Sequence, residues 1–198
     1  MNRLLMILAL LIFLLSACSN NDSKSNIISA VELTERENAI LSTISDKSFV
    51  FDFNIDSEYK KVSVWIEKYE FGEMVHDKIS PITTQVEGNG SIIFATSKVD
   101  DNQKQHTFNI GISSIGSTGS ISGLDTSSFD LDGMSSVWGS FQEVNNSVEG
   151  EVVLASICYS TDGHMRSLTT DFYQDVDSHM NELENYDVVY LLKAEFIK

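Results

Sequence analysis

Two cysteines are the only thiols in the 198-residue chain, and they stand in different surroundings. Cys18 lies in the stretch LLSACSNND, residues 14–22, where an apolar run gives way abruptly to small polar residues. Cys158 lies inside the apolar, strand-like run VVLASICYS. A thiol is a nucleophile, and it can accept an acyl group only where another molecule can reach it. Cys18 is therefore the candidate for covalent chemistry, and Cys158 is interpreted as a buried, inert side chain.

The segment before Cys18 is typical of an export signal. Arg3 supplies one positive charge, and every residue from Leu4 to Leu15 is apolar. Twelve residues in a helix cover roughly 18 Å, well short of the ~30 Å hydrocarbon core of a bilayer. The sequence therefore predicts a cleaved signal peptide rather than a lasting transmembrane span.

The tetrapeptide Leu15-Ser16-Ala17-Cys18 resembles the lipobox of bacterial lipoproteins, which has an aliphatic residue, two small residues and a cysteine. The resemblance covers about the first eighteen residues, and all four positions match. It implies that the Cys18 thiol receives a diacylglyceryl group and that a signal peptidase cuts between Ala17 and Cys18. Further acylation, typically with palmitate, would leave the domain on the cell membrane, at its extracytoplasmic face. The alternative is an ordinary secretory signal in which Cys18 is incidental.

Composition limits the possible partners. Without residues 1–17, the chain has 181 residues, enough for a single domain with its own core, and 12 basic against 29 acidic residues give a formal charge of −17. Such a surface repels nucleic acid and anionic lipid headgroups, so we expect neither as a partner. The proline-poor body, whose composition leans towards Asn, Lys and Ser, resembles uncharacterised lipoproteins of low-GC Gram-positive bacteria, a resemblance that implies no activity.

Two patterns suggest metal ligands. Asp175, His179 and Glu182 fall on a similar face of a predicted helix, as ligands of a helix-borne site do. A solvated helix face explains the same spacing. Asp52, Asn54, Asp56 and Glu58 alternate as in a calcium loop, but Phe53 and Ile55 fill the gaps and the turn glycine is missing, so an EF-hand is excluded. We predict no metal and no cofactor.

Other candidate residues have simpler explanations. His164, in STDGHMRS, or His179 would serve as general base if the protein were a hydrolase, but proximity in sequence does not make a triad. Trp65 and Trp138 would suit a sugar-binding face, although tryptophan more often packs in a core. We assign no catalytic residue.

The elements that must position these residues are mostly strands. The sequence predicts a flexible tether over 18–28 and one globular domain over 29–198. Within it, SAVELTERENAILSTISDKS, residues 29–48, predicts a helix with Thr34 and Glu37 as a capping box. Phe49, Phe51, Phe53 and Ile55 then alternate with polar residues, which predicts a half-buried strand.

Further strands are expected along the rest of the domain. They are predicted at 60–72, around Pro81 as an edge strand or strand start, at 91–97 after the turn EGNGS, and at 106–114, 135–142, 151–160 and 188–196, the last of them central. Residues 113–128 are rich in Gly and Ser and predict a loop. A helix capped by Asp171 is expected over 171–187, with Phe172, Val176, Met180 and Leu183 as its apolar stripe.

These elements predict a mainly β fold of the α+β type, an antiparallel β-sandwich or barrel-like domain with one N-terminal helix and one helix before the last strand. For function, we expect a lipid-anchored envelope protein that serves as a non-enzymatic binding or accessory module. An envelope hydrolase and a metal-capturing surface protein are the alternatives.

Overall fold

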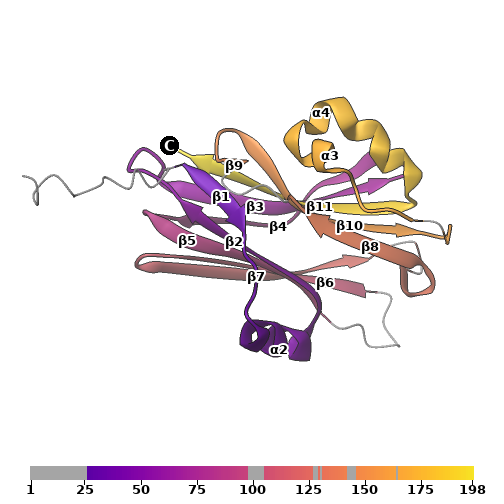
Figure 1. Cartoon of the computed structure of the whole chain (residues 1–198), viewed down its shortest axis with the longest axis horizontal. Helices are drawn as coiled ribbons and strands as arrows, with labels where there is room; N and C mark the ends of the chain where they lie inside the picture. The colour runs from indigo at the N-terminus through magenta and orange to yellow at the C-terminus, as the bar shows by residue number, and fades with distance from the viewer. Residues whose placement is uncertain (1–25, 98–104, 127–128, 130, 142–145, 164) are drawn as a thin grey trace, which may run out of the picture.

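The computed structural model describes residues 26–97, 105–126, 129, 131–141, 146–163 and 165–198. Two antiparallel sheets face each other, and they do not close into a barrel (Figure 1). This confirms the predicted mainly β sandwich with a helix near the N-terminus and a helical segment before the last strand. The predicted signal peptide, Cys18 and most of the tether lie outside the described residues.

Sheet A has the strand order β7-β6-β5-β2-β1-β9 and sheet B the order β4-β3-β11-β10-β8. Sheet A contains β1 (Ile27–Ala30), β2 (Ser45–Asn54), β5 (Asn89–Ser97), β6 (Gln105–Ser114), β7 (Ser117–Thr126) and β9 (Asn146–Ser147). Sheet B contains β3 (Lys61–Glu70), β4 (Glu73–Gln85), β8 (Ser135–Ser140), β10 (Glu151–Ser160) and β11 (Val188–Ile197). As predicted, the last strand is central, and Pro81 lies in an edge strand.

The core lies between the sheets and follows the predicted alternation of residues. Phe51 and Phe53 of β2 are buried, with Phe49 packed beside them. The ring of Phe49 stacks on Phe94 of β5 at 6.2 Å, and Phe94 stacks on Phe108 of β6 at 6.0 Å. Because alternate residues of a strand point to opposite faces, the same parity that buries these rings determines which polar residues also face inward.

The N-terminal helix is shorter than predicted and lies on the surface. α2 spans Glu35–Ile44, and the predicted capping box is confirmed: Thr34 accepts a hydrogen bond from the Glu37 amide, and its own amide donates to the Glu37 carboxylate. No residue of α2 is buried. β1 begins at Ile27, so the end of the predicted tether belongs to sheet A. Local capping, rather than burial, defines this helix.

The helical segment before β11 covers the outer face of sheet B (Figure 1). The apolar stripe is confirmed, since Phe172 and Leu183 are fully buried and Val176 and Met180 pack against the core. The continuous helix and its Asp171 cap are wrong. Three short helices, α3 (Thr170–Gln174), α4 (Val176–His179) and the 3₁₀ helix η2 (Met180–Asn185), replace it, and Thr169 caps the first by accepting from the Phe172 amide. The backbone leaves helical geometry at Asp175, where φ is −142° and ψ is 81°.

The predicted loop over 113–128 is also wrong, because its described residues form the hairpin of β6 and β7. A short 3₁₀ helix, η1 (Leu131–Gly133), then leads towards β8. The glycines of β7 allow a close approach to β4, the edge strand of the other sheet: a Cβ at Gly119 would lie 2.5 Å from Thr84 Oγ1. A Gly- and Ser-rich strand therefore joins the two sheets along one side.

Among the described residues, no helix has the length and apolar character needed to cross a bilayer.

This packing predicts the effect of one methyl group. A Cβ at Gly123 would overlap the Ser80 side chain and lie 2.8 Å from Ser80 Cβ, so we expect Gly123→Ala to destabilise the fold by about 1–3 kcal/mol. Gly133→Ala is the matched control, since no heavy atom lies within 4 Å of its Cβ position. Urea denaturation measures both; equal midpoints for the two variants would contradict the packing of β4 against β7.

Candidate functional site

The three residues predicted as metal ligands before β11 do not converge. Asp175 caps α4 by accepting from the Ser178 amide, and Glu182 accepts from the amide and hydroxyl of Thr169. His179 Nδ1 lies 2.8 Å from the Asp175 carbonyl oxygen. A carbonyl only accepts, so Nδ1 carries the proton. Each side chain is thus used to terminate or join a short helix.

The acidic residues around the end of β2 are also dispersed. Asp52 accepts from the Ser91 hydroxyl, Asp56 accepts from Asn26, and Glu58 pairs with Lys198. The first of these contacts joins β2 to β5, and the other two tie the segment after β2 to Asn26 and to the C-terminal Lys198. In the part of the chain that the structure describes, His, Cys, Asp and Glu side chains do not gather in groups of three that could hold a metal ion.

The remaining predicted residues are separated as well. His164 lies outside the described residues. Trp65 is buried in sheet B, with Lys78 Nζ 4.9 Å from its ring centre, so it does not line an open sugar-binding face. Trp138, on β8, is 53% exposed. Cys158 is buried, and burial raises the pKa of its thiol to about 12, in keeping with the predicted inert role.

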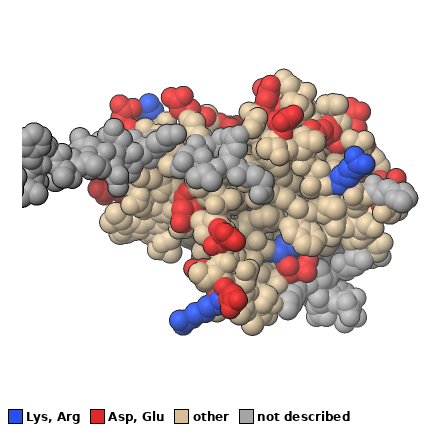
Figure 2. All heavy atoms as spheres, in the orientation of Figure 1, with Lys and Arg blue, Asp and Glu red and all other residues tan. Residues whose placement is uncertain are grey.

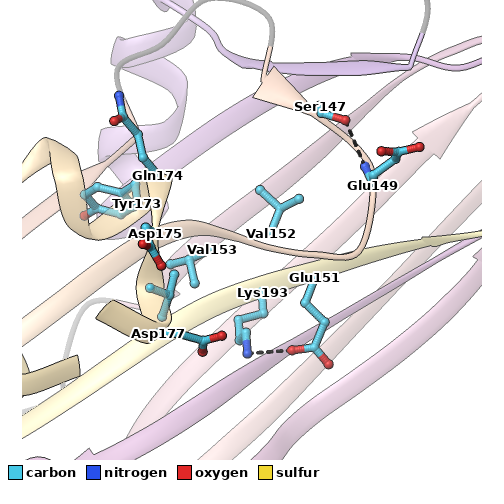
Figure 3. Close-up of a pocket in the computed structure, with 11 residues that line it drawn as sticks. Ser147, Glu149, Glu151, Val152, Val153, Tyr173, Gln174, Asp175, Asp177 and Lys193 are labelled. Carbon is cyan, nitrogen blue, oxygen red and sulfur yellow. Dashed lines mark hydrogen bonds and ion pairs between the residues drawn. The ribbon is translucent and has the colours of Figure 1, made fainter. Parts of the chain in front are cut away.

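A groove of about 500 Å³ lies between the α3–α4 segment and the outer face of sheet B (Figure 3). Four carboxylates line it, from Glu149, Glu151, Asp175 and Asp177. Lys193 is the lysine among the described residues that line the groove, and its Nζ is paired with Glu67 at 3.0 Å and with Glu151 at 2.7 Å. Burial works to lower the Lys193 pKa, but these hydrogen bonds outweigh it and hold the pKa above its usual value. The groove is therefore strongly acidic; Asp and Glu are also far commoner than Lys and Arg over the molecular face in Figure 2.

A second group of polar residues lies between the sheets, at the end of the sandwich away from Asn26. We call it the polar end and define it by Lys47, Lys68, Thr96, His106, Asp125, Tyr159 and Tyr190. Each continues an inward-facing row of its strand: Lys47 follows the parity of Phe49, Phe51 and Phe53, and His106 that of Phe108, Ile110 and Ile112. The apolar rows thus end in polar side chains at one end of the molecule.

One half of the polar end is a closed network. Lys68 Nζ lies 3.1 Å from Asp125 and 3.0 Å from Glu70, and Tyr190 donates to Asp125 at 2.6 Å. Burial, with the hydrogen bond to Asp125, raises the pKa of Tyr190 and keeps it a donor. The charge of Lys68 is fully compensated, as a buried ammonium group requires.

The other half surrounds a cavity of about 170 Å³. Lys47, Thr96 and His106 line it from sheet A, and Ser136 and Tyr159 from sheet B. The His106 and Tyr159 rings are 6.0 Å apart. Most of these groups can donate a hydrogen bond, which distinguishes this cavity from the acidic groove.

The same end carries an exposed apolar hairpin tip, formed by Phe71, Met74 and Val75 at the β3–β4 turn. These side chains are 58%, 50% and 47% exposed. Phe71 has a positive φ of 52°, and its ring packs against Phe129 at 5.8 Å. None of the residues of the polar end or of this hairpin tip was among the candidates predicted from the sequence. The signal was present in the parity of the strands, because Lys47, Lys68 and His106 each occupy an inward position.

The fold and these cavities define an antiparallel β-sandwich domain with an acidic groove on the outer face of sheet B and a polar end between the sheets. The model of the YgaN domain family matches residues 27–196, so the chain belongs to that family. No curated protein and no solved structure matches the chain.

The burial of Cys158 predicts a slow thiol. In a Cys18→Ala variant, where Cys158 is the remaining cysteine, we expect alkylation by iodoacetamide at pH 8 to be at least about a hundredfold slower in the folded protein than in urea. The raised pKa keeps the thiol protonated at this pH, and sheet B and the helical segment cover it. Mass spectrometry follows the reaction; rapid modification of the folded protein would contradict the inert role.

Proposed function

We propose that the protein is a lipid-anchored protein of the bacterial cell envelope, held by acylated Cys18 on the extracytoplasmic face of the cell membrane. Its β-sandwich then serves as a binding or accessory module. The observation that carries the anchor is the tetrapeptide Leu15-Ser16-Ala17-Cys18 after an apolar segment too short to span a bilayer. Two acyl chains hold a protein firmly, whereas one is marginal.

The distance from Cys18 to the domain supports this arrangement. β1 starts at Ile27, and the eight Cα-to-Cα steps from Cys18 to Asn26 span at most about 28 Å. Asn26 bonds to Asn54 and Asp56, at the end of the sandwich opposite the polar end. Lys47 lies seven residues from Asn54 along β2, or about 23 Å. An anchored domain would therefore have its tethered end near the bilayer and its polar end free to point away.

The binding role is supported by what lies at the free end. The 170 Å³ cavity and the exposed hairpin tip of Phe71, Met74 and Val75 both lie there. Adjacent exposed apolar side chains on a protein of this charge are typical of contact surfaces. The hydrolase alternative gains no support from His179, whose ring is bonded within its own helical segment.

The anchor is tested by exchanging one cysteine at a time. We expect Cys18→Ala to abolish labelling of the protein by a palmitate analogue in bacterial cells and to move the domain out of the washed membrane fraction. Cys158→Ala is the matched control and should be labelled and retained like the wild type. Undiminished labelling of the Cys18→Ala protein would reject the anchor; mass spectrometry of the N-terminal peptide identifies the modified residue.

A further inference from the structure

Lys47 differs from the buried Lys68 and the partly buried Lys193 in how its charge is compensated. Lys68 and Lys193 each contact two carboxylates. Among the described residues, Lys47 pairs with a single one, that of Asp46, at 2.6 Å. The Lys47 side chain is 8% exposed, whereas that of Asp46 is 54% exposed. A buried cation thus relies on an acid that faces the solvent.

Aromatic rings complete the surroundings of the ammonium group. Lys47 Nζ lies 4.9 Å from the centre of the Trp138 ring and 5.9 Å from that of Tyr159. Ring faces attract a cation, but they do not replace oxygen acceptors for its N–H groups. The ammonium group is therefore held in place with donor capacity to spare.

The adjoining cavity has the size and chemistry for a small anion. Its volume of about 170 Å³ corresponds to roughly five or six waters at ~30 Å³ each. Thr96, His106, Ser136 and Tyr159 supply hydroxyl and imidazole groups, while Leu131 and Met134 add apolar wall. Asp46 is the only carboxylate among the described lining residues, in contrast to the four that line the groove.

We propose that this cavity binds a small carboxylate, whose oxygens replace those of Asp46 at Lys47 Nζ. Asp46 then turns towards the solvent, where it is already half exposed. A planar carboxylate fits because Asp46 itself presents one to Lys47 Nζ. The inference rests on the proposed binding role and specifies its ligand class; it does not depend on the lipid anchor.

The test is a titration of the purified full-length protein in detergent with sodium acetate, sodium succinate and sodium phosphate at constant ionic strength. The indole N–H resonance of Trp138 reports on the site, since its ring lies against Lys47. We expect saturable shifts with the carboxylates and weaker shifts, or none, with phosphate. Tighter binding of phosphate than of either carboxylate would overturn the ligand class.

Three variants make the test specific. Lys47→Met should abolish the shifts, whereas Lys78→Met should not, although Lys78 lies over Trp65 at the same 4.9 Å. Asp46→Asn should tighten acetate binding severalfold, because it removes the competing carboxylate. The acetate affinity of Asp46→Asn still tests the proposal if Lys47→Met fails to fold. Unchanged acetate affinity in Asp46→Asn would overturn the proposal, and intact acylation of the same samples would separate that result from a failure of the anchor.

Discussion

The alternation of residues along each strand is the constraint on which the rest of the structure depends. It sends Phe51, Phe94 and Phe108 into one layer between the sheets, where their packing supplies the core. The same alternation sends Lys47, Lys68 and His106 inward at one end, because each continues an apolar row. The core and the polar end therefore follow from the same alternation. A sandwich with this core must also compensate the charges of the lysines that face inward at the polar end.

Compensation is achieved in two ways. Lys68 is enclosed by Asp125 and Glu70, with Tyr190 donating to the same Asp125 carboxylate, so its charge is satisfied within the protein. Lys47 is compensated by rings and by the exposed Asp46. In the first arrangement every partner is needed, because removing any one of them would leave a buried charge without compensation. In the second arrangement the acid is already half exposed, so Asp46 can turn to the solvent without crossing an apolar region.

The sequence alone predicted most strands of the two sheets, but it did not predict the residues of the polar end. Period-two patterns predicted β2, β3 and β6, and continuous apolar runs predicted β10 and β11, because both patterns are local properties of the chain. The predicted loop over 113–128 failed because Gly119 and Gly123 are explained by the approach of β4, a contact between distant segments. Asp175, His179 and Glu182 have helical spacing, but the helix breaks at Asp175. The polar end combines residues from both sheets, and no single stretch of sequence shows which rows end together.

The central place of β11 has a consequence for how the chain is made. β11 pairs with β3 on one side and with β10 on the other. Because β11 is the last strand in the chain, the β4-β3 pair and the β10-β8 pair of sheet B cannot be joined until β11 has been made. During that time the inner face of sheet A lacks a complete partner sheet, so the core between the two sheets cannot be completed. The domain therefore completes its core only when its last strand has been made, so the final step of its folding comes late in its synthesis.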